Sequence, residues 1–122
     1  MRSVILISLI ALCISVNPPI WANRWSQDFV ENYTSAGGVY TVGRHWYDYN
    51  NNNERVTYQN GQYETVCSSI MPNVNTQCTQ VITNGNLWVI FPEKQQCCRC
   101  CDGASGCIIK NPLWLQAFTY VG

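Results

Sequence analysis

The sequence carries little charge, and its charges cancel. Seven Lys and Arg residues balance seven Asp and Glu residues among 122, so the formal net charge is zero. A neutral chain lacks the basic patch by which proteins bind nucleic acids or anionic lipid surfaces. We therefore expect no nucleic-acid partner and no stable association with a membrane surface.

The sequence also lacks the motifs of common enzyme sites. His45 is the only histidine and thus the only imidazole available for proton transfer. There is no G-x-S-x-G serine motif and no glycine-rich phosphate loop, and the carboxylates show no paired spacing. We predict no enzymatic activity, no catalytic residue, no cofactor and no metal; a cleft with His45 beside a carboxylate would argue for a hydrolase instead.

The first 22 residues have the composition of a secretory signal peptide. Arg2 supplies the positive charge, residues 4–16 form an apolar run, and Ala22 is a small residue suited to cleavage. This run is shorter than the roughly 20 residues of a membrane-spanning helix. We expect cleavage of residues 1–22, contact with a membrane only during export, and a secreted, extracellular product.

Cysteine is abundant in the rest of the chain. Eight cysteines less Cys13 leave seven: Cys67, Cys78, Cys97, Cys98, Cys100, Cys101 and Cys107. Exported thiols oxidise, and disulfides stabilise domains with small cores, so we predict disulfides. The C-x₂-C spacings within 97–101 also occur in zinc sites, which is the less favoured interpretation.

The sequence does not determine which cysteines pair. Cys67 and Cys78 flank one loop and could pair with each other or with the cluster. Because seven is odd, one cysteine is left as a free thiol, bridges to another chain, or has its partner in a missing part of the sequence.

Two short motifs have surface interpretations. Asn32-Tyr33-Thr34 is an N-glycosylation sequon, which predicts a glycan on Asn32. Residues 48–54 alternate oxygen ligands as calcium loops do, but they lack the glycine required at the sixth position. We therefore favour a solvated turn there.

The order of elements predicts a mainly β protein. Residues 23–38 are polar without a period and predict an N-terminal arm with at most a helical turn. The following domain, 39–122, is expected to be a disulfide-stapled antiparallel meander or half-barrel. Its predicted strands cover 39–49, 55–59, 62–67, 78–83, 87–91 and 113–121. Asn60-Gly61 and Asn84-Gly85 predict two-residue hairpin turns, and 97–107 a stapled loop.

Aromatic residues are dense on the predicted strands. A period of two puts Tyr40, Val42, Arg44 and Trp46 on one side of the first strand, with Thr41, Gly43, His45 and Tyr47 on the other. Large rings on both faces require cover from the chain itself, a ligand or another subunit. The residues that we predict to contact a ligand or partner are Trp46, Trp88, Trp114, Tyr47 and Tyr49.

Several segments resemble a family of small, secreted, cysteine-rich proteins of ciliates. They are residues 43–49, the Asn stretch 50–53, Glu54-Arg55-Val56, residues 91–102, Gly106-Cys107 and Trp114-Leu115. The pattern over roughly 37–120 is also similar to the ependymin-related and LolA-like group. This similarity implies a curved antiparallel half-barrel that shelters an apolar ligand, and strands beyond Gly122 that would leave this sheet incomplete at the C-terminus.

Together these features favour a non-catalytic, secreted structural or recognition module. We expect it to self-associate or to bind another extracellular protein, as a subunit of an assembly in which a neighbour's N-terminal arm completes the open sheet edge. The alternative is a carrier of a lipid or other apolar ligand. A deep apolar groove lined by Trp46, Trp88 and Trp114 would favour the carrier.

Overall fold

The computed structural model describes residues 19–117, and the chain divides into two compact units. The larger unit is Ala22–Lys110; the smaller one combines Met1–Trp21 with Asn111–Gly122. The predicted signal peptide lies almost entirely outside the described residues. Across 19–117, no helix has the length and apolarity that crossing a membrane would require.

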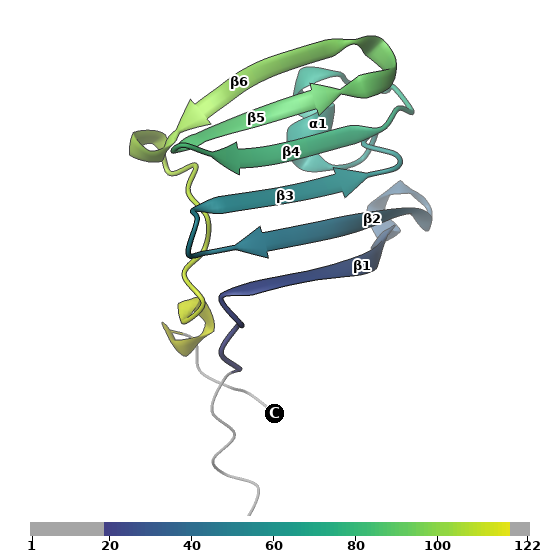
Figure 1. Ribbon diagram of the computed structural model, residues 1–122. Coiled ribbons are helices and arrows are strands. Elements are labelled where there is room, and N and C mark those ends of the chain that lie inside the picture. Colours follow the sequence, from purple (N-terminus) through teal and green to yellow (C-terminus); the bar gives the residue numbers. More distant parts are fainter. Residues whose placement is uncertain (1–18, 118–122) are drawn as a thin grey trace, which may run out of the picture. The chain divides into compact units, whose positions relative to one another are not determined.

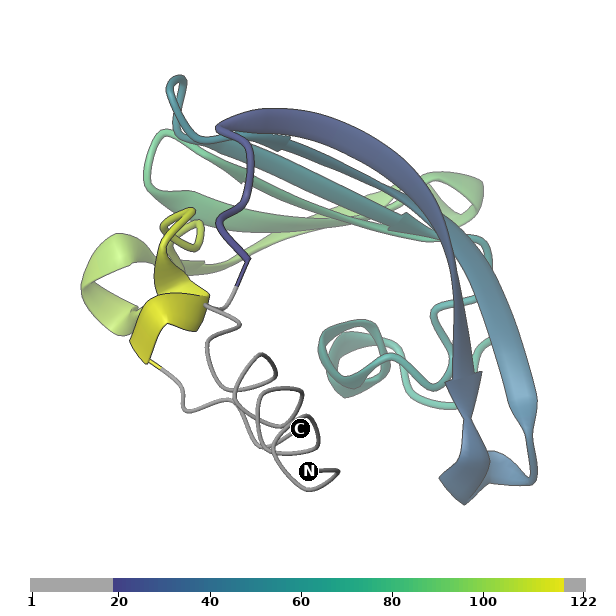
Figure 2. The same ribbon diagram turned by 90° about the horizontal axis from the view of Figure 1, so that it is seen from below.

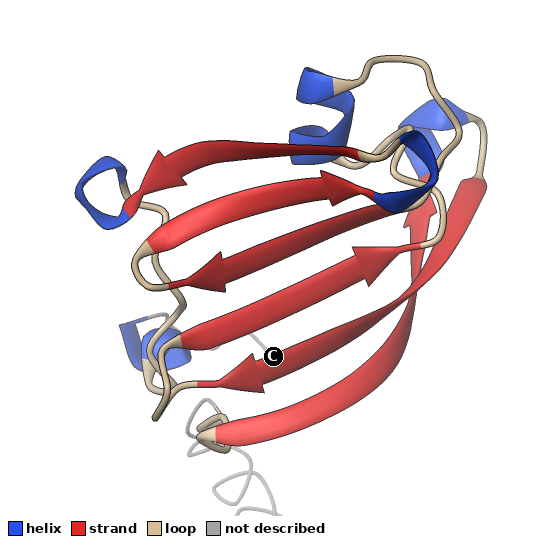
Figure 3. Cartoon of the chain, turned by 45° about the horizontal axis from the view of Figure 1, so that its top comes forward, coloured by secondary structure: helices blue, strands red, loops and turns tan. Residues whose placement is uncertain are grey.

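The larger unit contains one antiparallel sheet of six strands, in which each strand pairs with the next along the chain (Figures 1 and 3). The strands are β1 (Arg24–Tyr33), β2 (Val39–Asp48), β3 (Asn53–Tyr58), β4 (Cys78–Thr83), β5 (Asn86–Phe91) and β6 (Gln96–Asp102). The predicted mainly β meander is confirmed. The sheet is not closed, and β1 and β6 are its two edges.

Strand β1 occupies the segment predicted to be an N-terminal arm, and that prediction is wrong for residues 24–33. All ten residues pair with β2, from Arg24 opposite Asp48 to Tyr33 opposite Val39. The ring of Phe29 fits here because Gly43, directly opposite, has no side chain; a Cβ on Gly43 would collide with that ring. Since β1 is part of its own sheet, the structure does not support donation of this segment to a neighbour.

The side-chain alternation predicted for the first strand is confirmed in β2. Thr41 and Tyr47 are buried on one face, whereas Tyr40 and Val42 on the other face are exposed. The Asn84-Gly85 hairpin is also confirmed, because both residues have the positive φ of a type I′ turn, 49° and 71°.

Residues 62–67 do not form the predicted return strand. They lead into the short helix α1 (Thr65–Ile70), which begins at Glu64, whose carboxylate accepts a hydrogen bond from the Cys67 N–H at 2.8 Å. Neither Asn60 nor Gly61 has a positive φ. Gly61 is needed instead because the Cys67–Cys78 disulfide packs directly against it. A Cβ on this residue would lie 2.6 Å from the Cys78 Cβ and 3.0 Å from the Cys67 Cβ.

The cysteine-rich segment is also more regular than predicted. Most of the expected loop belongs to β6, which pairs with β5 and contains a β-bulge. Buried or half-buried cysteine behaves as a small apolar residue and is compatible with a strand. The Cys101–Cys107 disulfide closes a much shorter segment containing the 3₁₀ helix η4 (Gly103–Ser105).

The predicted last strand is wrong over its described part. Trp114–Ala117 is a 3₁₀ helix, η5, in the smaller unit. There the Trp114 ring meets the Trp21 ring edge to face, with centroids 5.4 Å apart. Residues 118–121 of that predicted strand lie outside the described residues.

The core lies on the inner face of the sheet, which curves around α1 (Figure 2). Its buried members are Cys67, Cys78, Leu87, Val89 and Phe91. At the other end of this face, Tyr47 is buried and its hydroxyl donates a hydrogen bond to the Lys110 carbonyl. No described helix of this unit covers the opposite, outer face (Figure 2).

Candidate functional site

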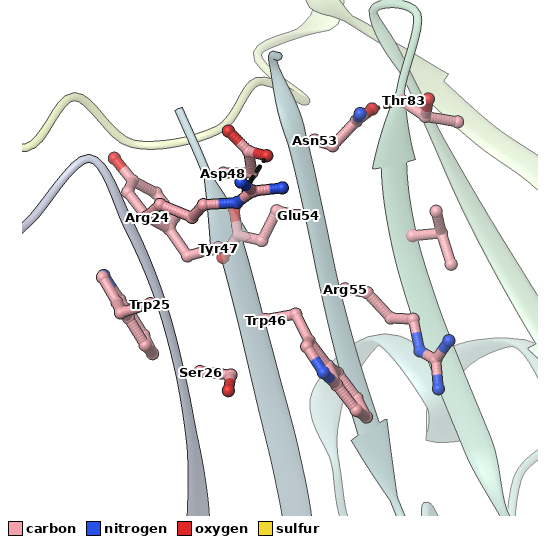
Figure 4. Close-up of a pocket in the computed structure, with 11 residues that line it drawn as sticks. Arg24, Trp25, Ser26, Trp46, Tyr47, Asp48, Asn53, Glu54, Arg55 and Thr83 are labelled. Atoms are coloured by element: carbon pink, nitrogen blue, oxygen red, sulfur yellow. Dashed lines mark hydrogen bonds and ion pairs between the residues drawn. The ribbon is translucent and has the colours of Figure 1, made fainter. Parts of the chain in front are cut away.

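The outer face of the sheet presents a tryptophan between two arginines. Trp46 on β2 lies directly opposite Arg55 on β3, and the Arg55 guanidinium carbon is 4.1 Å from the indole centroid. Arg44, two residues before Trp46, places its own guanidinium carbon 5.3 Å from the same centroid. Both distances are within the range of cation–π attraction, which restricts the orientation of the indole. Figure 4 shows the Arg55 side chain beside Trp46.

Two hollows flank this cluster, and both include Trp46 and Arg55. The first has a volume of about 560 Å³ and also contains Arg24, Asp48 and Val81, among others (Figure 4). The second has a volume of about 610 Å³ and extends towards Val30 and Val42. Neither is the groove lined by Trp46, Trp88 and Trp114 that would favour a carrier, because neither hollow includes Trp88 or Trp114.

The charges on this face are mixed in sign. Arg24 pairs with Asp48 at 3.2 Å, and Arg44 pairs with Asp28 at 3.3 Å. Hydrogen bonds from Asn51, with a further contribution from Arg24, hold the pKa of Asp48 below its usual value. Arg55 forms no ion pair with any residue in 19–117.

Next to Trp46 lies a group of exposed apolar side chains. Val30 is 69% exposed, Tyr40 65% and Val42 44%, and Val30 and Val42 are directly opposite each other on β1 and β2. We call the set Val30, Tyr40, Val42, Arg44 and Trp46 the β1–β2 patch. Contiguous exposed apolar groups of this kind mark contact surfaces in soluble proteins.

The structure separates the five aromatic residues predicted as contacts. Trp46 and Trp88 share the outer face, since both lie in one register row through Arg55 and Val81. Tyr47 points to the inner face and is buried, while Tyr49 follows β2 and stacks on Tyr47 at 6.5 Å. Trp114 belongs to the smaller unit.

The sequon residue Asn32 is exposed on β1 and lies directly opposite Tyr40. A glycan there would extend from the same face as the β1–β2 patch.

His45 does have a carboxylate beside it, the feature that would favour a hydrolase. Its Nε2 is 2.7 Å from Glu54 Oε1, and the edge of its ring meets Trp25 with centroids 4.6 Å apart. However, it lines neither of the two hollows beside Trp46, and within 19–117 no hydroxyl or thiol is hydrogen-bonded to it. This geometry fits a packed side chain better than a proton-transfer group facing a substrate.

The seven predicted disulfide cysteines fall into two sets. Cys67 is bonded to Cys78, and Cys101 to Cys107. Free thiols remain on Cys97, Cys98 and Cys100, all on β6. Burial, together with the hydrogen bond to Cys98, raises the pKa of the Cys100 thiol to about 11. Among residues 19–117, no three His, Cys, Asp or Glu side chains are grouped as a metal site would need.

No protein-family model, curated protein or solved structure matches this chain. The resemblance to ciliate proteins and to the half-barrel group therefore stays a prediction.

Proposed function

We propose that this protein is a non-catalytic extracellular structural module that associates with copies of itself through the β1–β2 patch. The observation that carries the proposal is the Trp46 indole, fixed between two guanidinium groups on an uncovered sheet face. Tryptophan and arginine are the residues that most often dominate binding energy in protein interfaces. Because the cation–π contacts already restrict Trp46, its ordering on association costs little entropy.

The neighbouring side chains favour a protein partner over a small apolar ligand. Val30, Tyr40 and Val42 extend the apolar surface along two strands, as a broad interface requires, rather than around an enclosed cavity. Small-molecule sites are concave and enclose most of the ligand, whereas the two hollows beside Trp46 lie open along the outer face and include neither Trp88 nor Trp114.

The charge pattern favours a second copy as the partner. The outer face of β1 to β3 alternates arginines with Asp28 and Asp48, so a facing copy would present both signs. A two-fold contact places the same patch on both sides and needs such self-complementarity. A face of one sign would repel its own copy.

An extracellular location is supported by two features. The disulfides Cys67–Cys78 and Cys101–Cys107 are cross-links that persist in oxidising compartments. The N-terminal sequence supplies the second, with the composition of a signal peptide.

Sedimentation velocity over a wide concentration range tests the proposal. The protein is first freed of any glycan by enzymatic treatment and is kept under reducing conditions that spare the buried disulfides. We expect a reversible dimer for the wild type and at least tenfold weaker association for Trp46→Ala. Trp88→Ala is the matched control, because it removes an indole from the same face outside the patch. A wild type that stays monomeric at the highest concentration, or equal loss in both variants, would overturn the proposal.

A further inference from the structure

The edge strand β6 carries three cysteines outside the two disulfides. Cys97 and Cys100 are exposed, and Cys98 is half-buried against the core. β6 pairs with β5 on one side, and no strand within 19–117 pairs with the backbone groups on its other edge. Three accessible or nearly accessible thiols thus lie on an open edge of the sheet.

Two of these thiols are already close together. The β-bulge leaves Cys100 as the extra residue, since Trp88 pairs with Arg99 and Leu87 with Cys101. The Sγ atoms of Cys98 and Cys100 are 3.1 Å apart, compared with about 2.0 Å in a disulfide. A small side-chain movement would bring them to bonding distance.

Cys97 is then left over. It pairs in register with Ile90, whereas Cys98 pairs with Val89. A hollow of about 370 Å³ at this end of β6 is lined by both Cys97 and Cys98, together with Ile70 and Phe91 among others. Once Cys98 and Cys100 are joined, Cys97 has no thiol partner among residues 19–117.

We propose that Cys98 and Cys100 form a third intrachain disulfide and that Cys97 forms a disulfide with Cys97 of a second copy. A second copy has the same open strand edge and the same unpaired Cys97 thiol. A two-fold arrangement of two copies therefore places Cys97 of one copy next to Cys97 of the other. This contact is on a different strand from the β1–β2 patch. The only assumption that this contact has in common with the proposed function is that the protein is in an oxidising compartment.

The oxidant is a low-molecular-weight disulfide, of which oxidised glutathione is the laboratory form. A cysteine thiolate attacks it, giving a mixed disulfide and releasing one small thiol. The second cysteine thiolate then displaces the other small thiol. For each bond formed, two protein thiols lose two protons and two electrons, and one external disulfide is reduced to two thiols.

The test uses the secreted full chain, equilibrated in a glutathione redox buffer, alkylated with iodoacetamide and analysed without reduction. We expect a covalent dimer in denaturant, a Cys97–Cys97 peptide on mapping, and no alkylated cysteine. Cys97→Ser should give only monomer in denaturant, with the third intrachain bond kept. The double variant Cys98→Ser/Cys100→Ser is the matched control and should keep the dimer.

Mapping of the wild type alone decides the outcome, even if a variant folds poorly. Alkylated Cys97 in a monomer, or Cys97 bonded to Cys13, Cys98 or Cys100 of its own chain, would overturn the inference. Sedimentation of Cys97→Ser under reducing conditions still reports on the β1–β2 patch, so the two proposals fail separately.

Discussion

Removal of the Cys67–Cys78 disulfide should destabilise the sheet more than removal of the second cross-link. The bond closes a loop with a sequence separation of 11, for which loop entropy gives about 2.8 kcal/mol. Cys101–Cys107, with a separation of 6, gives about 2.2 kcal/mol. Most of the expected difference in unfolding free energy between the two disulfide variants comes from packing, because Cys67 is only 1% exposed and Cys78 0% exposed.

Those buried sulfur atoms hold α1 on the inner face. Their loss in Cys67→Ala/Cys78→Ala adds about 1–2 kcal/mol of lost packing, for a total of roughly 4 kcal/mol. For a domain whose stability is about 5–15 kcal/mol, this is a large fraction. The partly exposed second pair adds little beyond its loop entropy.

Urea unfolding followed by tryptophan fluorescence measures both variants against the wild type. We expect Cys101→Ala/Cys107→Ala to lose about 2 kcal/mol, half the loss of the buried pair. A buried-pair loss below about 1 kcal/mol, or a loss no larger than that of the second pair, would refute the view that cross-links compensate for the small core.

Two further predictions concern the surroundings of α1. Gly61→Ala should cost about 1–3 kcal/mol by overpacking against the disulfide. Gly103→Ala would place its Cβ 3.3 Å from the Cγ2 methyl of the exposed Ile108 and 3.8 Å from the Gly85 carbonyl oxygen, and should be nearly neutral in the same urea assay. Burial raises the pKa of Glu64 in the folded state above its ordinary value, although hydrogen bonds from the start of α1 oppose the shift. The stabilising contribution of the protonated carboxyl is therefore complete below the unfolded pKa and lost as pH rises through the folded pKa. Measured against Glu64→Gln, wild-type stability should fall as the pH rises above the unfolded pKa, and an opposite slope would contradict the assignment.

Strands with local signals were predictable. β4 has the predicted bounds, and β5 begins one residue earlier, because β-branched residues flank an Asn-Gly pair that fixes the turn. Asn60-Gly61 carries the same dipeptide, yet long-range packing decides its conformation. The Cys67–Cys78 bond lies against Gly61, and no local pattern reports that contact.

The two edge strands were missed for a different reason. An edge strand buries few side chains, so its hydrophobic period is weak. In β1 only Trp25, Phe29 and Tyr33 are half-buried, every fourth residue instead of every second. In β6 the inward positions include Cys98 and Cys101, whose composition suggested an irregular stapled loop.

The candidate site was predictable only in part. Trp46 follows from its strand and its alternation. Arg55 depends on the register between β2 and β3, and Val30 on the existence of β1, and both are contacts between strands that a single strand's pattern does not specify.

The two proposed contacts lie at opposite sides of one open sheet, and this determines what they build together. If both proposals hold, the β1–β2 patch joins copies at one side, and Cys97 on β6 joins them at the other. Each contact alone is two-fold and stops at a dimer. If each copy uses both contacts, the two two-fold axes differ. The copies then form an open chain in which reversible and covalent contacts alternate. On the two proposals together, oxidation of Cys97 would decide whether copies stop at a dimer or extend into a longer chain.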